Sequence, residues 1–241
     1  MATLLLRLAA PLQSYGTGSK FEIRKTDALP SKSALIGLLA AALGRRRDSD
    51  LQDLNALRFG VRADLPGEVT YDFQMARLVR KKRTGDDVVP YITYRYYIQD
   101  GIFLVGFESE DMAFLRELDE AMHHPVFHLF LGRKSYVPTP PISLGVRDLS
   151  LEDALRQEAW LVPDWRQSRA DRHLLLQFES TEGTAVDGLR RDHAVSFDPA
   201  QRLYADRAVY QDMMTIDAAK PTNEDTEHDI FAALEEEESC T

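Results

Sequence analysis

The framework of this chain is set by residues 30–47, which read Pro-Ser-Lys-Ser-Ala-Leu-Ile-Gly-Leu-Leu-Ala-Ala-Ala-Leu-Gly-Arg-Arg-Arg. Leucine, isoleucine and alanine recur there at helical spacing and predict an amphipathic helix that buries a broad apolar face. Ser31 or Ser33 suits the N-cap position, and Gly44 suits the position just beyond the last turn. The free N–H groups of a helix start favour an anion, and Lys32 lies beside them. The stretch therefore predicts either a phosphate site at Lys32 and Ser33 or an ordinary core helix with solvated ends.

Charge is distributed unevenly along the chain, although the whole carries a formal net charge of −10. Residues 1–47 hold eight basic side chains against Glu22 and Asp27, a net charge of +6. Residues 217–241 hold nine acidic side chains against Lys220, a net charge of −8. A local basic face matters more to a polyanion than the global sum, so nucleic acid remains a candidate ligand. We expect residues 217–241 to form an acidic, disordered tail.

Cysteine content and hydrophobic runs bound the class of protein. The 241 residues contain one cysteine, Cys240, which excludes an intramolecular disulfide framework. The apolar start at residues 4–10 is interrupted by Arg7 and is too short for a signal peptide or a membrane span. We therefore expect a cytoplasmic protein without a membrane partner.

The N-terminal segment combines a predicted strand at residues 3–9 with a long loop at residues 12–29. Tyr15 can stack on a base, Gly16 lets a backbone approach a ligand closely, and Arg24 can meet a phosphate. The loop therefore predicts an RNA contact, with a mobile surface loop as the alternative.

Residues 67–98 are rich in β-branched and aromatic residues on both sides of a basic cluster, Arg80-Lys81-Lys82-Arg83. This pattern predicts a long β-hairpin, a thumb over about residues 67–100, with a cationic tip. Adjacent cations repel one another and need water or an anion, so the tip is a phosphate contact or a solubilising turn. The tyrosines beyond it favour RNA, because stacking and phosphate contacts would then lie side by side.

The order of the predicted elements indicates the fold class. After the first strand and helix come a strand at 59–63, the inserted hairpin, a strand at 102–108, a helix ending near Met122 and a strand at 126–131. This is the ferredoxin-like (RRM-like) βαββαβ arrangement, a fold of the α+β class.

The prolines that follow Tyr136 indicate a stiff connector and a domain boundary. We place a ferredoxin-like RNA-binding domain at residues 1–141 and a smaller β-rich part at residues 142–216. The second part is predicted to hold strands at 173–179 and 203–210, with residues 190–192 in a loop between them.

Motifs for catalysis are sparse. The chain has no dinucleotide-binding glycine fingerprint and no Walker loop. The histidines at 123, 124 and 128 are interrupted by a proline and make no helical metal pair, so we expect neither a metal nor another cofactor. A metal-independent ribonuclease needs only a general base, a general acid and a cation, which Tyr15, Lys32 and a histidine could supply. That activity stays open as an alternative.

Three linked motifs resemble the Cas5 family of type I-E CRISPR Cascade complexes. They are Leu5 to Gly16, Pro30 to Arg45, and Leu131-Gly132-Arg133-Lys134-Ser135 followed by prolines. They occur in the family's order across most of the first 145 residues, and Tyr15 keeps an aromatic side chain where the family usually has tryptophan. The resemblance implies a ferredoxin-like body with a thumb that binds the 5′ handle of the CRISPR RNA without cutting it.

The resemblance also implies partners in antiviral defence. Family members cap the filament of CasC backbone subunits, contact the large subunit CasA, and reach target DNA only through the complex. RNA cutting in type I-E systems belongs to CasE, whereas in a related subtype the Cas5 protein cleaves the precursor. A non-catalytic subunit is therefore expected, with an endoribonuclease that processes repeat RNA as the alternative.

The residues and the resemblance together predict one RNA-binding groove on the N-terminal half. It combines the first loop, both ends of the first helix, the glycine turn that precedes the prolines, and the thumb. The predicted contacts are Tyr15, Gly16, Arg24, Lys32, Ser33, Arg45, Arg46, Arg80, Lys81, Lys82, Arg83, Arg133, Lys134 and Ser135. A protein–protein scaffold, with basic residues against acidic partner surfaces, is a further alternative.

Overall fold

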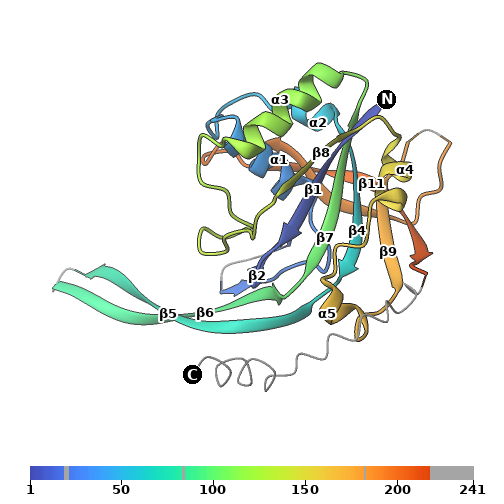
Figure 1. Ribbon diagram of the computed structural model, residues 1–241. Coiled ribbons are helices and arrows are strands. Elements are labelled where there is room, and N and C mark those ends of the chain that lie inside the picture. Colours follow the sequence, from blue (N-terminus) through green and yellow to red (C-terminus); the bar gives the residue numbers. More distant parts are fainter. Residues whose placement is uncertain (19–21, 83–84, 182, 218–241) are drawn as a thin grey trace, which may run out of the picture.

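The chain forms a body built on one antiparallel sheet, with a long hairpin that projects from it (Figure 1). The computed structural model describes residues 1–18, 22–82, 85–181 and 183–217. The seven strands of the sheet lie in the order β10 (Gly188–Ser196), β11 (Leu203–Thr215), β9 (His173–Glu179), β4 (Arg58–Leu65), β7 (Ile102–Ser109), β1 (Ala2–Ala9) and β8 (Ser143–Arg147). The fold is of the α+β class, as the sequence predicts. The acidic segment that follows Asp217 lies outside the described residues.

Helices cover both faces of this sheet. α1 (Lys32–Ala42) and α3 (Met112–His123) pack on one face, and α4 (Leu151–Gln157) packs on the other. In β1, Leu4 and Leu6 belong to the core on the α1 side, and Leu5 belongs to the core on the α4 side. A strand covered on both faces is a near-continuous apolar run, and this explains why the N-terminal stretch is so hydrophobic. The remaining short helices are α2 (Gln52–Ala56) and α5 (Asp164–Gln167).

The helix predicted from residues 30–47 is confirmed as α1. Its end is a glycine cap: Gly44 has a φ of 75°, its N–H donates to Ala41 O, and the N–H of Arg45 donates to Ala40 O at 2.8 Å. Glycine adopts this left-handed conformation without the penalty that a Cβ imposes.

The strand predicted at residues 126–131 is wrong. The N–H groups of Val126 and Phe127 donate to the last carbonyls of α1, Ala42 O and Ala41 O, at 3.0 and 3.2 Å. These backbone donors are therefore taken by a helix end and not by a neighbouring strand. The strand that lies beside β1 is β8, which begins beyond the prolines.

The loop predicted at residues 190–192 is also wrong, because these residues lie within β10. Their buried side chain, Asp192, is held by Arg207 of β11, and this contact between distant residues favours a paired strand over a loop. The strands that follow Pro141 form no sheet of their own among the described residues. They extend the central sheet at both edges, with β8 beside β1 and β9 beside β4.

The projecting hairpin matches the one predicted from sequence. β5 (Glu68–Lys82) and β6 (Gly85–Gln99) each have 15 residues and pair from Glu68–Gln99 at the root to Lys82–Gly85 near the tip. The short strands β2 (Leu12–Gln13) and β3 (Ile23–Arg24) pair with β6 near its root. The N-terminal loop is thus laid along the base of the hairpin.

Candidate nucleic-acid interface

The start of α1 is occupied by the protein's own carboxylates. The backbone N–H of Lys32 donates to Asp192 Oδ2 at 2.9 Å, and Ser31 makes no side-chain cap. Lys32 Nζ donates to Glu179 Oε2 at 2.8 Å and to Asn55 O at 2.9 Å, and its side chain is 1% exposed. Burial lowers the pKa of Lys32, although Glu179 opposes that shift. The anion expected at this helix start is therefore supplied internally, and Lys32 is not on the surface.

Asp192 also binds Arg207, with Oδ1–Nε and Oδ2–Nη2 distances of 2.9 Å. The Arg207 guanidinium lies 5.2 Å from the ring centroid of Phe59. Ser33, the other predicted contact here, is half-buried, and its Oγ is 3.5 Å from Ser31 Oγ. This end of α1 is a buried ionic cluster that ties the helix to β9, β10 and β11.

Tyr15 is a core residue and not an exposed stacking platform. Its ring is buried edge-on against Phe103, and its hydroxyl donates to Gln13 Oε1 at 2.6 Å. Burial raises the pKa of this hydroxyl. The next residue, Gly16, is exposed.

The arginines that follow α1 have different surroundings. Arg45 forms a two-pronged ion pair with Asp53, whereas the side chain of Arg46 is exposed. Among the described residues, no contact links either arginine to the glycine turn at Arg133. The start of α1 therefore cannot line the predicted groove, because Lys32 is buried, whereas Arg46 at its other end is exposed.

The glycine turn packs against the N-terminal loop at the root of the hairpin. Ser14 N–H donates to Leu131 O at 3.1 Å. Gly132 has a φ of 90°, and a Cβ there would lie 1.8 Å from Ser14 O, so this close approach requires glycine. Arg133 is held by its Nη2 bond to Tyr96 O at 2.8 Å. Lys134, next in the turn, is exposed.

Arg133 also donates from Nη1 to the Tyr136 hydroxyl at 2.8 Å, and its guanidinium lies 5.4 Å from the centroid of that ring. These contacts fix its orientation at the surface. Ser135, predicted as a further contact, is exposed beside it.

Cations from three segments meet at this root. β3 runs parallel to β6 with Arg24 beside Arg95, and Arg133 Nη2 lies 3.5 Å from Arg24 O. We call Arg24, Arg95, Arg133 and Lys134 the root surface. Sequence reasoning identified three of them and missed Arg95, because its position opposite β3 depends on a pairing that no local pattern reveals.

The hairpin also carries an aromatic face, on the side of the ribbon opposite to Arg95, since Arg95 alternates with Tyr94 and Tyr96 along β6. The register places Tyr71 opposite Tyr96 and Phe73 opposite Tyr94 on one side of the ribbon. Ring centroids are 5.4 Å apart for Tyr71–Tyr96 and 6.2 Å for Phe73–Tyr94. Tyr71, Phe73 and Tyr94 stay 55%, 51% and 41% exposed, although they are large apolar side chains. The sequence showed these aromatics, but only the register shows that they share a face.

The tip of the hairpin is described only in part. The backbone pairs Arg80 with Asp87 and Lys81 with Asp86. The side chains predicted to contact RNA here, those of Arg80, Lys81, Lys82 and Arg83, lie outside the described parts of the chain.

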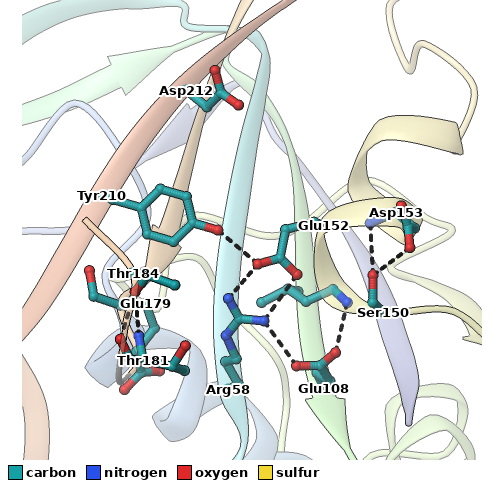
Figure 2. Close-up of polar contacts among 12 residues, drawn as sticks. Arg58, Glu108, Ser150, Glu152, Asp153, Glu179, Thr181, Thr184, Tyr210 and Asp212 are labelled. Atoms are coloured by element: carbon teal, nitrogen blue, oxygen red, sulfur yellow. Dashed lines mark hydrogen bonds and ion pairs between the residues drawn. The ribbon is translucent and has the colours of Figure 1, made fainter. Parts of the chain in front are cut away.

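A second polar cluster lies at the end of the sheet away from the hairpin, near Glu179 (Figure 2). Arg58 of β4 bonds both Glu108 of β7 and Glu152 of α4, with Nη1–oxygen distances of 3.2 and 3.0 Å. The Tyr210 hydroxyl donates to Glu152 at 2.7 Å, and Glu108 accepts the N–H of Leu151 at 2.9 Å. These bonds fasten α4 and β11 to the sheet, although Arg58 Nε is buried without a hydrogen-bond partner among the described residues.

Burial and hydrogen bonding shift the titration of this cluster. Burial disfavours the ionised form of Glu152, but bonds from Arg58 and Tyr210 outweigh it and lower the pKa. Burial and the bond to Glu152 raise the pKa of Tyr210 to about 12. Both shifts keep Glu152 charged and Tyr210 protonated at neutral pH.

The described residues include neither a metal-binding cluster nor a membrane-spanning helix. No cluster of three or more His, Cys, Asp and Glu side chains there has the arrangement to hold a metal ion. No helix there is long and apolar enough to cross a membrane.

Comparison with known proteins adds independent information. A family model described as CRISPR-associated protein (Cas_Cas5) matches residues 3–210. The CRISPR system Cascade subunit CasD of Escherichia coli (strain K12) is 33% identical over 156 residues, covering 59% of this chain and 70% of that protein.

Solved structures are similar over more of the chain. One, described as the crystal structure of a Cas protein, shares 39% identity with a TM-score of 0.67 and covers 88% of this chain and 95% of its own. Another, a chain of a CRISPR RNA-guided surveillance complex, shares 29% identity with a TM-score of 0.74 and covers 92% and 95%.

Proposed function

The chain belongs to the Cas5 family of CRISPR-associated proteins, and we propose that it holds the 5′ handle of CRISPR RNA within a Cascade surveillance complex. The observation that carries this proposal is the gathering of cations from three segments at the root of a hairpin that also carries exposed rings on its other side. Backbone phosphates bind the cations of the root surface, while bases that pass to the other side of the hairpin stack on its rings.

The similarity to a Cascade subunit and to a chain of an RNA-guided surveillance complex supports this role. Support also comes from topology, because β4-β7-β1-β8, with α1 and α3 on one face, has the strand order of a ferredoxin-like βαββαβ unit. In this assignment β8 is the last strand of the unit. The type I-E subtype and the antiviral role belong to the same proposal.

The proposed RNA contacts are fewer than the sequence predicted. Arg24, Arg133, Lys134 and the hairpin tip are kept, and Arg95 and the aromatic face are added. Lys32 and Tyr15 are removed, because both are buried and already bonded to other residues of the chain. The overall charge of −10 is no obstacle, since the cations of the root surface act locally.

The remaining partners follow from the same role. We propose that the chain contacts CasC backbone subunits and the large subunit CasA in the cytoplasm, and meets target DNA only as part of the complex. The projecting hairpin offers the longest reach toward a neighbouring subunit (Figure 1).

We propose further that the chain does not cut RNA. The ribonuclease alternative needed Tyr15 and Lys32 as exposed catalytic groups, and both are buried. Incubation of the protein with repeat RNA and a chelator should leave the RNA intact. Cleavage at a defined position would establish the endoribonuclease instead.

Salt dependence of RNA binding tests the root surface directly. In single-stranded RNA each lost phosphate contact lowers the slope of log K against log salt by roughly 0.7. We expect Arg24→Ala with Lys134→Ala to weaken binding of handle RNA and to reduce the slope by about one to one and a half units.

The matched control is Arg46→Ala, which removes an exposed arginine that no contact links to the root surface. This control should keep both affinity and slope. A double variant with an unchanged slope would remove the root surface from the RNA site. RNA bound equally well by every variant would favour the scaffold alternative.

A further inference from the structure

An exposed tryptophan lies beside Leu65, at the end of β4 that leads into the hairpin. Trp165 of α5 is 76% exposed, the most exposed of the large hydrophobic residues that the structure describes. It lines a hollow of about 340 Å³ together with Leu65, Arg166, Arg169 and Ala170. None of the four residues of the root surface lines this hollow. A large exposed aromatic side chain beside arginines is typical of a binding surface.

Arg166 and Arg169, which line this hollow, and the nearby Arg172 form no ion pair with a carboxylate of the described residues. The two nearby carboxylates are engaged elsewhere: Asp164 accepts from Gln167 Nε2 at 3.0 Å, and Asp171 bonds His173. We call Trp165, Arg166 and Arg169 the Trp–Arg surface. It is suited to an acidic segment that also carries apolar side chains.

The chain itself supplies such a segment beside this surface. After β11, the N–H of Ile216 donates to Arg172 O at 2.9 Å, so the described part of the chain ends close to Ala170, which lines the hollow. Residues 218–241 hold eight acidic side chains against Lys220. Their apolar residues Ile230, Phe231 and Leu234 lie between the acidic groups at 224–229 and 235–238.

We propose that residues 218–241 bind back to the Trp–Arg surface of the same molecule. In this arrangement Phe231 covers Trp165, and flanking carboxylates pair with the arginines. Reach is no obstacle, because the 13 residues from Asp217 to Ile230 span up to about 45 Å when extended. Tethering also raises the effective concentration of the segment to roughly the millimolar range, so weak contacts suffice.

This contact has a consequence for other ligands. The bound segment excludes other anionic chains, nucleic acid included, from the Trp–Arg surface. High ionic strength weakens the binding of the segment, because exposed charge pairs are screened by salt. The inference does not depend on the proposed RNA function, since it concerns a separate surface and a ligand within the chain.

Tryptophan fluorescence tests the proposal, because the chain has only two tryptophans, Trp160 and Trp165. In a Trp160→Phe background, Trp165 is the single reporter. We expect acrylamide to quench Trp165 at least twofold less in the full chain than in a chain ending at Asp217. High salt should remove that difference, and a synthetic peptide of residues 218–241 should restore protection to the shortened chain.

Two variants separate the roles of charge and apolar contact. In the full chain, Arg166→Ala with Arg169→Ala should abolish protection, as should Phe231→Ser. The matched control Arg191→Ala removes an exposed arginine on β10 and should leave protection intact. Circular dichroism of each variant establishes that the fold is unchanged, so loss of protection reports binding.

Two results would overturn the proposal. One is equal quenching of Trp165 in the full and shortened chains at low salt. The other is a short single-stranded oligonucleotide that protects Trp165 equally in both chains, which would make this a nucleic-acid surface that the tail does not occupy. Tighter oligonucleotide binding by the shortened chain would support it.

Discussion

At the scale of single residues, the surrounding side chains determine whether a residue predicted to contact RNA is buried or exposed. Lys32 and Arg133 are both cations next to helix or strand ends, and the sequence treats them alike. Lys32 is enclosed by Glu179, Asp192 and Arg207, whereas Arg133 is held at the surface by Tyr96 and Tyr136. The first is part of the core, and the second is available to a ligand.

The buried position of Lys32 gives a stability prediction. Lys32→Ala leaves Glu179 without its buried partner, and breaking one side of a buried ion pair costs about 3–5 kcal/mol. We expect urea denaturation to show that loss, while Arg46→Ala shows less than about 0.5 kcal/mol. A Lys32→Ala protein with unchanged stability and weakened RNA binding would return Lys32 to the RNA site.

At the scale of secondary-structure elements, we expect substitutions on the aromatic face of the hairpin to change RNA binding without changing the stability of the fold. That aromatic face is about half exposed, so truncation there removes little core. We expect Tyr71→Ala with Phe73→Ala to leave the urea midpoint nearly unchanged. The same change should weaken handle RNA binding by about 1–3 kcal/mol for each base that loses its stacking partner.

The control for this prediction lies on the other side of the same strand. Gln74→Ala alters an exposed residue that faces away from the rings, and its RNA affinity, measured by fluorescence anisotropy, should equal that of the original chain. Equal losses in both variants would show that the hairpin face has no special role.

The attachment of α4 to the sheet predicts a dependence of stability on pH. The pKa of Glu152 is lower in the folded chain than its ordinary value of 4.5. Its contribution to stability is therefore complete above that value and is lost as pH falls through the lower folded pKa. We expect Glu152→Gln to be less stable than the original at pH 7 and to show a shallower decline in acid. Parallel stability curves for the two proteins between pH 7 and pH 3 would contradict this role.

At the scale of the whole molecule, one sheet joins both halves of the sequence. Removing everything after Pro141 takes away β8 at one edge, β9, β11 and β10 at the other, and α4 on one face. Leu5 and Leu104 would then lose the helix that covers them. We expect residues 1–141 alone to be unfolded or aggregated by circular dichroism and gel filtration. A folded monomeric fragment would establish that the N-terminal part is an independent domain.

The sequence by itself determined the elements whose signals are local. Helical spacing and Gly44 predicted α1 and its end, and runs of β-forming and apolar residues predicted the hairpin, β1, β4 and β7. Linked motifs also indicated the Cas5 family. These features depend on residues a few positions apart, and the physics of turns, caps and periodic burial acts over that range.

The tertiary structure alone decided which charges face a ligand. Asp192 lies 160 positions from Lys32 yet fills the start of α1, and Arg95 reaches the root surface only through the pairing of β6 with β3. The segment at 126–131 does not form the predicted strand, and its first two N–H groups, those of Val126 and Phe127, donate to carbonyls at the end of α1. Such contacts arise when distant segments pack, and nothing in local spacing records them, because burial and pairing depend on the whole fold.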